Sequence, residues 1–382
     1  MAVSYLNIIS AIILFQLTLL VFFLFTSRKG KILSNRILAL FFILFIINLS
    51  DGLLTYYGFY TRFPALAHLE DGFVFLLGPT IFFYTRTMVY HDFKLRARHL
   101  RHTIPFFVVT LAYQFYYHLQ TAASQQKIQD AILNQTLPPF FYISIIFIYM
   151  HVAVYLWLSL RELARYREKI RQRFSTLGEI NMNWLSFMLW SVVFILVVSL
   201  IYTFVPVVGL REYFNIVFGI SFFLIFFFIN AVVWKGLRQP EIFSGIEFDV
   251  PVAEDSPSEP ADPNIKIVQD KLTRIMGEEK PYLSADLSLE GLAEKVGLSP
   301  KRVSQAINEG FGKNFFEYVN EHRIREAERI FEESTDPGLT VLEVMYASGF
   351  NSKSSFNGIF KELTGMTPSE YKRQAFQRQQ SV

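Results

Sequence analysis

The sequence predicts an all-α protein: a bundle of seven membrane-spanning helices, a disordered acidic linker, and a domain of short amphipathic helices. First, 52% of the 382 residues are hydrophobic, and the apolar residues form stretches near the roughly 20 residues that cross a bilayer. Second, Lys+Arg and Asp+Glu number 20 and 9 in residues 1–238, none and 7 in 239–264, and 16 and 17 in 265–382. We therefore expect a membrane domain, a linker and a soluble domain with these three boundaries.

The membrane domain is expected to contain seven spans. A soluble core could not absorb seven such stretches within 238 residues, so buried core helices are a poor alternative. The start of the chain, MAVSYLNIIS, lacks the basic region of a signal peptide, which indicates a retained first span. The spans are expected at about 4–26, 37–59, 67–89, 103–120, 138–160, 184–206 and 213–234.

Basic residues in the short loops between the spans predict the orientation. One set of alternate loops carries 17 Lys and Arg, and the other carries only Arg62, Lys127 and Arg211. Because the richer set lies on the cytoplasmic side, the N-terminus should be outside and the C-terminal domain in the cytoplasm. The chain is thus expected to be a multi-pass protein of the cytoplasmic membrane, with the lipid bilayer as a partner.

The segment QPEIFSGIEFDVPVAEDSPSEPADPN, residues 239–264, is acidic and rich in proline. Such a composition cannot bury enough apolar surface to fold, so disorder is expected. As a flexible chain its 26 residues would reach about 28 Å.

From residue 265 to 382 the sequence pattern predicts short amphipathic helices with clear start and stop signals. In LSLEGLAEKVGLSPKRVSQAI we expect a helix over 288–296, a turn at Gly297, and a second helix capped by Ser299 with Pro300 at its first position. This is the pattern of a helix-turn-helix unit, whose second helix enters the major groove of DNA.

A second unit of the same kind follows in TVLEVMYASGFNSKSSFNGIF. Thr340 and Glu343 have capping-box spacing, and Gly349 marks the turn. A longer amphipathic helix over 315–331 is expected to connect the two units. Two such units on one rigid helix could contact two successive major-groove faces about 34 Å apart.

The C-terminal domain resembles the DNA-binding domain of the AraC family, and the whole chain resembles the branch with a multi-span membrane domain. The motifs LLGPTIFFYTRTMV in the third expected span and LRQPEIF after the seventh are similar to that branch. The matching residues of the C-terminal signature are Gly349-Phe350, Phe356, Phe360-Lys361, Gly365, Thr367-Pro368 and Tyr371. The resemblance implies double-stranded DNA as a partner.

The resemblance also implies which exposed side chains meet base edges. Lys suits guanine acceptors, and Gln or Asn suits adenine. The expected base-reading residues are Lys301, Ser304, Gln305, Lys353, Ser354 and Asn357. The side chains better suited to phosphates are Arg302, Lys313, Arg323, Arg325, Lys361, Lys372 and Arg373. The alternative is that these are ordinary solvated surface charges.

Three residues depart from the family pattern. Met345 stands where a small residue is usual, Ser348 replaces an apolar turn residue, and Gly358 replaces a commonly basic one. A receptor or transporter whose helix-turn-helix module serves protein interaction is therefore an alternative function.

Polar groups within the spans are candidates for signal sensing. Asp51 lies in the second expected span, and Glu70 and Asp71 open the third from the same outer side. Carboxylates within a bilayer mark functional sites by default, although Asp51 could also serve as an interhelical hydrogen-bonding group. His151 lies in the fifth expected span. A small ligand or ion at the spans is the expected signal, and spans that only tether the domain are the alternative.

Enzyme chemistry is not expected. The chain has no cysteine, and it lacks a phosphate-binding loop, a zinc-protease motif and a triad arrangement. No histidine pair has a metal-ligand spacing, so neither a metal nor another cofactor is expected. The preferred function is a membrane-anchored transcription factor. A homodimer is expected by analogy, because paired half-sites increase specificity.

Overall fold

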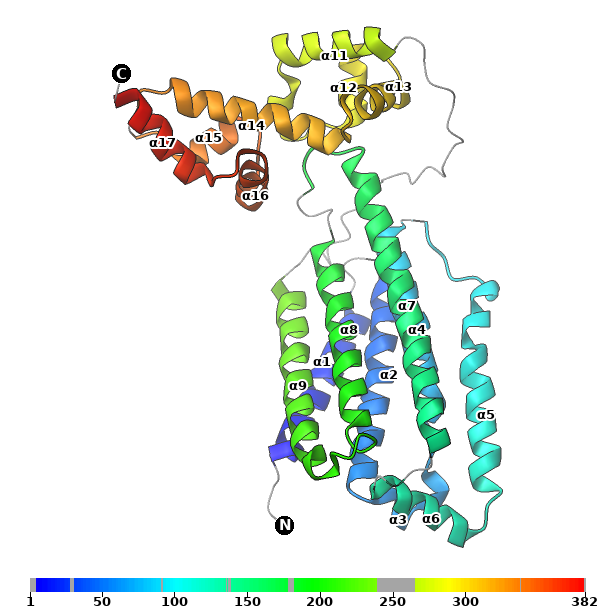
Figure 1. The fold of residues 1–382 in the computed structure, drawn as a ribbon. Coiled ribbons are helices and arrows are strands. Elements are labelled where there is room, and N and C mark those ends of the chain that lie inside the picture. The colour runs from blue at the N-terminus through cyan, green and yellow to red at the C-terminus, as the bar shows by residue number, and fades with distance from the viewer. Residues whose placement is uncertain are drawn as a thin grey trace. The chain divides into compact units, whose positions relative to one another are not determined.

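The computed structural model describes residues 5–27, 31–90, 92–134, 136, 139–177, 182–238, 265–336 and 338–380. These residues form two compact units, an N-terminal helical bundle and a C-terminal domain (Figure 1). The regular elements of the described residues are helices. One antiparallel β-bridge, between Phe174 and Ser288, lies within the C-terminal unit. The expected disordered linker, 239–264, lies outside the described residues.

The N-terminal unit is a bundle of apolar helices. α2 packs against both α1 and α4, and α9 packs against α1 and α8. Short helices and 3₁₀ turns connect them. The helices of this part are α1 (Tyr5–Thr26), α2 (Ile32–Tyr56), α3 (Phe59–Arg62), α4 (Val74–Val89), α5 (Ile104–His118), α6 (Ala122–Leu133), α7 (Pro139–Arg171), α8 (Asn183–Phe204) and α9 (Phe214–Arg238).

Five stretches among the described residues are long and apolar enough to cross a membrane. They are Ile8–Thr26, Ile32–Tyr56, Pro64–Val89, Phe141–Arg171 and Asn183–Phe204. The expected span at 103–120 forms α5, whose 15 residues extend only about 22 Å. The apolar stretch in α9, Ile216–Val232, is also shorter than the others. The structure therefore supports five spanning helices, and the number seven remains a prediction.

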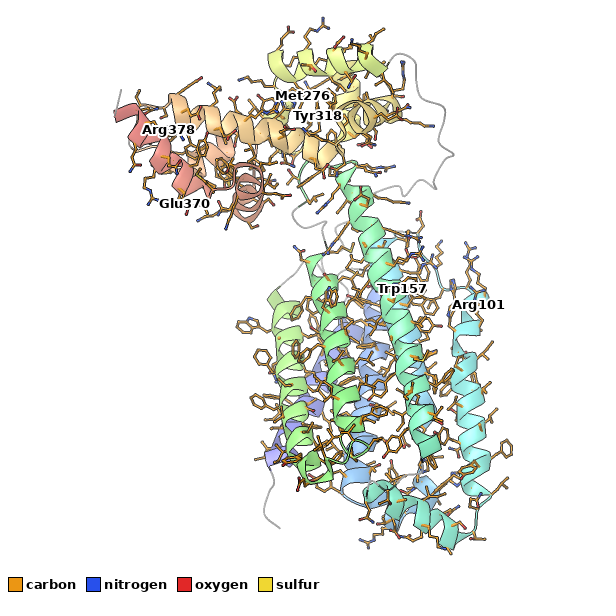
Figure 2. All side chains as sticks on the ribbon, in the orientation of Figure 1. Arg101, Trp157, Met276, Tyr318, Glu370 and Arg378 are labelled. Atoms are coloured by element: carbon orange, nitrogen blue, oxygen red, sulfur yellow. The ribbon has the colours of Figure 1, made fainter. Side chains whose placement is uncertain are left out.

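The outer surface of the bundle carries large apolar side chains. Phe22, Trp157, Trp190 and Phe227 each expose more than half of their surface, and Figure 2 labels Trp157 on α7. Water disfavours such contiguous apolar surface, whereas lipid chains do not. The surface of these helices thus suits a bilayer.

The C-terminal domain contains two groups of helices joined by α14 (Phe315–Glu333), which runs between them (Figure 1). The first group is α11 (Ile265–Glu278), η6 (Pro281–Leu283), α12 (Leu289–Val296), α13 (Pro300–Gln305) and the π-turn η7 (Ala306–Gly310). The second group is α15 (Val341–Ala347), α16 (Lys353–Thr364) and α17 (Pro368–Gln380).

Each group has its own hydrophobic core, and α14 supplies side chains to both. Tyr318 and Val319 pack in the first core with Met276, and Figure 2 labels Met276 and Tyr318. Ala327 and Phe331 pack in the second core. Because one helix serves two cores, the connection between the groups is stiff.

Residues 165–177 group with the C-terminal domain and not with the bundle. They comprise the last residues of α7 and the segment that follows it. The expected division at residue 238 assigned them to the membrane domain. The C-terminal unit is therefore built from two separate parts of the chain.

Candidate functional site

The first helix-turn-helix unit is formed by α12 and α13. The Ser288 side chain accepts a hydrogen bond from the Gly291 backbone N–H and caps α12. Gly297 ends α12 with a left-handed backbone, φ 69°, a conformation that glycine adopts without steric cost. Ser299 caps α13, with Pro300 at its first position. The predicted turn and caps are confirmed.

The second unit is formed by α15 and α16. The capping box between Thr340 and Glu343 is present at the start of α15. Met345 is 2% exposed and belongs to the second core. Ser348 is buried, and its hydroxyl donates to the carbonyl oxygens of Val344 at 2.7 Å and Met345 at 3.1 Å. Two of the three departures from the family pattern are thus accommodated inside the domain.

Gly349 forms the turn of the second unit and approaches the first group of helices closely. Its φ is +88°, and a Cβ at this position would lie 2.4 Å from the carbonyl oxygen of Tyr282. The backbone of 282–283 therefore packs directly against the turn of the second unit. This contact connects the two units independently of α14.

The predicted base-reading residues lie on the second helix of each unit. Lys301 on α13 and Lys353, Ser354 and Asn357 on α16 are exposed. Ser304 and Gln305 are half-buried. The Gln305 amide donates to Glu309 at 3.1 Å, and the Ser304 hydroxyl accepts from Asn308 at 3.4 Å. Both contacts are with partners four residues along the chain, so DNA could replace them at little cost.

The predicted phosphate-binding residues divide into two groups. Arg325, Lys361 and Arg373 are exposed, and Arg302 is half-buried. Lys313 is already paired with Glu321. The Lys372 ammonium donates to the Leu339 carbonyl oxygen at 2.5 Å. Arg325 also donates to Glu321 at 2.7 Å. Lys313, Arg325 and Lys372 would therefore each exchange an internal contact for a phosphate.

The expectation for Arg323 needs correction. Its side chain is fully buried in α14, and burial lowers the pKa of its guanidinium to about 10. The guanidinium donates to carbonyl oxygens of Tyr282 at 2.7 Å and Ser284 at 2.8 Å. Arg323 thus has a structural role inside the domain, where a phosphate has no access to it.

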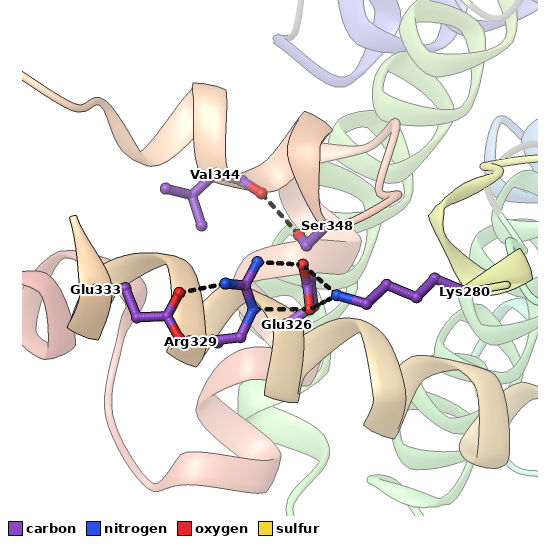
Figure 3. A network of polar contacts seen from close by, with 6 residues as sticks. All are labelled: Lys280, Glu326, Arg329, Glu333, Val344 and Ser348. Atoms are coloured by element: carbon purple, nitrogen blue, oxygen red, sulfur yellow. Dashed lines mark hydrogen bonds and ion pairs between the residues drawn. The ribbon is translucent and has the colours of Figure 1, made fainter. Parts of the chain in front are cut away.

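Charged side chains also connect α14 with the turn before η6 (Figure 3). Glu326 is 8% exposed. It accepts from Arg329 at 2.7 Å and from Lys280 at 3.2 Å, and Arg329 also pairs with Glu333. Hydrogen bonds from Arg329 lower the pKa of Glu326 most, and those from Lys280 add to the effect. The network holds the start of η6 against the connecting helix.

The N-terminal bundle contains a partly open cavity of about 550 Å³. Its walls are mainly apolar, and Asp51, Glu70 and Asp71 lie among its lining residues together with several tyrosines. One carboxylate oxygen from each of the three acids lies within 4.8 Å of the others. The structure thus brings together the three acids that the sequence singled out. Oxygen ligands of this kind suit a hard cation.

Neighbouring side chains order these acids. The Tyr60 hydroxyl donates to Asp51 at 2.9 Å and lies 3.4 Å from Glu70. The Nδ1 atom of His68 lies 2.7 Å from an Asp71 oxygen. His151 is separate from the cluster: it packs against Phe75 and Tyr155, and its ring nitrogens have no hydrogen-bond partner among the described residues. Sequence analysis did not single out Tyr60, although its spacing from Asp51 and Glu70 is short.

Two helix-turn-helix units joined by a long helix define a class of DNA-binding domain. A helix-turn-helix domain family matches residues 292–374. The C-terminal domain is of the AraC type, as the motifs indicated. The bundle, with its apolar helices, is consistent with the membrane domain of the resemblance.

Two curated relatives each match about a quarter of this chain. The transcriptional regulator GlxA of Rhizobium meliloti (strain 1021) is 28% identical over 104 residues, which are 27% of this chain and 31% of that protein. An uncharacterized HTH-type transcriptional regulator of Staphylococcus aureus (strain COL) is 31% identical over 103 residues, which are 27% of this chain and 13% of that protein. This chain thus spans less than a third of the length of these relatives.

Two solved structures are also similar to the C-terminal domain. The C-terminal domain of AraT, a response regulator from Geobacillus stearothermophilus, is 22% identical and covers 30% of this chain and 88% of its own, with a TM-score of 0.25. A DNA-binding transcriptional dual regulator from Escherichia coli K-12 is 21% identical and covers 31% of this chain and 99% of its own, with a TM-score of 0.25.

Proposed function

We propose that the protein is a membrane-anchored transcription factor whose C-terminal domain binds specific DNA under the control of the helical bundle. The observation that carries the proposal is the presence of two helix-turn-helix units with polar second helices in a chain that also holds five long apolar helices. The relatives of the C-terminal domain are named as transcriptional regulators, which favours a regulatory function over a catalytic one.

The proposed DNA contacts use both second helices. α13 and α16 would enter successive major grooves, with Lys301, Gln305, Lys353 and Asn357 at base edges. The 16 basic and 17 acidic residues of 265–382 nearly balance, so non-specific attraction to phosphates should be weak. Specific binding would then depend on base contacts and on a homodimer that occupies paired half-sites.

The proposed orientation places the C-terminal domain in the cytoplasm. We retain seven spans, with α5 and α9 crossing in addition to the five longer helices. The basic segments 86–101 and 161–173 fall on the same side of the membrane only if α5 crosses. The 17 basic residues in one set of loops against three in the other support this orientation.

The proposed signal acts at the cavity in the bundle. Its apolar walls and the cluster of Asp51, Glu70 and Asp71 suit a small molecule with an apolar body and a positive charge, or a metal ion. Such a ligand can shift the bundle between two packings only by its difference in affinity for them.

DNA binding can be tested with the full-length protein in lipid nanodiscs, by selecting bound genomic fragments and titrating salt. Gln305→Ala should weaken specific binding by about 1–3 kcal/mol and random DNA much less. Lys361→Ala, the control for phosphate contact, should weaken both alike. Binding that is equal on selected and random fragments would favour the protein-interaction function instead.

Sensing can be tested with Asp51→Asn in a transcription reporter. The variant should hold transcription in one state, high or low, while membrane abundance stays unchanged. Asp130→Asn, on the exposed surface of α6, is the matched control. A normal response of Asp51→Asn to the inducing condition would show that Asp51 only bonds neighbouring helices.

A further inference from the structure

The segment after α7 is built into the C-terminal domain. Residues 173–177 lie antiparallel to residues 285–289, and Phe174 is bridged to Ser288. The Leu289 N–H donates to the Arg173 carbonyl oxygen at 2.9 Å, and the Ser175 N–H donates to the Leu287 carbonyl oxygen at 3.4 Å. We call residues 173–177 the docking segment.

Ser175 is the centre of this contact and is 1% exposed. Its hydroxyl donates to the Leu287 carbonyl oxygen at 2.6 Å. Its carbonyl oxygen accepts from the Asn320 amide at 2.9 Å and from Arg323 at 3.2 Å. One small residue thus bonds both to the segment before α12 and to the connecting helix α14.

The docking segment also satisfies the buried charge of Arg323. The guanidinium donates to the Ser175 hydroxyl at 3.0 Å and to the Thr176 hydroxyl at 3.2 Å. The Thr176 hydroxyl in turn donates to the Ala285 carbonyl oxygen at 2.8 Å. A buried charge that loses partners is strongly destabilising, so the domain interior depends on this segment.

The contact lies where the two helix-turn-helix units meet. The same Arg323 donates to the Tyr282 carbonyl oxygen, which is the backbone atom that Gly349 approaches. Its guanidinium carbon also lies 5.5 Å from the centre of the Phe350 ring. Arg323 therefore connects the docking segment with the turn of the second unit.

We propose that the docking segment is an internal control element that fixes the relative position of the two helix-turn-helix units and so sets DNA affinity. The docked state is the DNA-competent one, because the bonds of Ser175 and Thr176 go to 285–287, Asn320 and Arg323, and leave the exposed faces of α13 and α16 uncovered. The claim that the docking segment sets DNA affinity rests on the proposed function.

The position of the docking segment in the chain suits this control. α7 is one helix of 33 residues. Tyr149 and Val152 on this helix line the cavity of the bundle, and the docking segment begins two residues after the helix ends at Arg171. A ligand that shifts α7 therefore acts on a helix that leads directly into the docking segment. The long segment 239–264 is not needed for this route.

Docking can be tested by cross-linking, since the chain has no native cysteine. Residues 174 and 288 form a narrow antiparallel pair, with Cα atoms about 4.5 Å apart, which a disulfide can join. Phe174→Cys with Ser288→Cys, together with a protease site within 239–264, should give fragments that stay joined after oxidation and cleavage and separate on reduction. Each single variant is a control. Fragments that separate without reduction would overturn the proposal.

Control of DNA affinity needs a second measurement on the full-length protein in nanodiscs. Ser175→Ala with Thr176→Val should weaken specific DNA binding about tenfold, because it removes four side-chain hydrogen bonds of the segment. Gln172→Ala, at an exposed neighbour whose side chain donates to Glu168 on α7, should leave binding unchanged. The oxidised cross-linked form should bind as tightly as the parent.

These two measurements separate the possible failures. Cross-linking does not involve DNA, so it reports docking even if the parent protein binds no specific site. If the parent binds a specific site and the double variant binds it equally well, the docking segment does not control affinity. That outcome overturns the proposal and leaves DNA binding intact.

Discussion

Two glycines nine residues apart should respond in opposite ways to the same substitution. A Cβ at Gly349 would lie 2.4 Å from the Tyr282 carbonyl oxygen, and the residue has φ +88°. A Cβ at Gly358, within α16, would meet nothing within 4 Å. We expect Gly349→Ala to lower the free energy of unfolding by about 1–3 kcal/mol and Gly358→Ala to raise it by about 1 kcal/mol.

The measurement is urea unfolding of the C-terminal domain within the full-length protein, followed by a signal from that domain. The two variants are matched controls for each other, because both add one methyl group to the second unit. Equal effects of the two substitutions would contradict the close approach of Gly349 to the first group of helices.

The role of Arg323 shows what sequence could and could not predict at this scale. Val319, Arg323, Ala327 and Phe331 recur every four residues and are all buried, so the spacing contained a signal that Arg323 faces inward. Sequence gave no such signal for Lys372, whose partner is the backbone of Leu339, 33 residues away. Basic side chains alone do not indicate whether their partner is DNA or the protein.

Among the elements, α14 should make the domain sensitive to acid through Glu326. Hydrogen bonds from Arg329 and Lys280 lower the pKa of Glu326 in the folded state. The resulting stability is fully present above the ordinary carboxyl pKa and is lost as pH falls through the lowered folded value. Glu326→Gln should therefore reduce the free energy of unfolding at pH 7 by about 1–3 kcal/mol and flatten its decline in acid.

Glu333→Gln is the matched control, since this carboxylate is on the same helix and pairs with the same arginine but is 61% exposed. Its effect should be much smaller. The measurement is urea unfolding between pH 3 and 7 for both variants. If the free energies of unfolding of the Glu326→Gln variant and the parent decline in parallel as pH falls, other groups cause the acid sensitivity.

Elements with local signals were predicted well. Ser299, Pro300 and the box of Thr340 and Glu343 mark helix starts, and the structure has these caps. Docking of residues 173–177 could not be predicted, because its partners lie more than 100 residues away. Nor did the apolar pattern at 103–120 show that α5 extends only from Ile104 to His118.

For the whole molecule, the orientation can be tested with reporter fusions. A reporter that is active only outside the cytoplasm should be active after Leu137 or Val208 and inactive after Arg98, Arg171 or Lys235. The reason is the unequal distribution of basic residues between the two sets of loops. Activity after Arg171 would contradict the orientation. It would also place residues 165–177 outside the cytoplasm, where they could not pack in a cytoplasmic C-terminal domain.

The composition changes sharply at residues 238 and 265, but nothing in it indicates that residues 165–177 group with the C-terminal unit. The gathering of Asp51, Glu70 and Asp71 was predictable, since a short connection joins the two expected spans that carry them. The cavity beside them was not, because its lining comes from helices far apart in sequence. The sequence thus predicted the cluster of acids, but not the cavity that it lines.

The discontinuous C-terminal unit has a consequence for proteolysis. Many tethered domains are freed by one cut in the connecting chain, but here a cut anywhere between residues 239 and 264 would leave the domain held by its contacts with residues 173–177. After such a cut the DNA-binding fragment should still sediment with membranes. A gene fragment that begins at residue 265 would likewise encode a domain that lacks one of its own pieces.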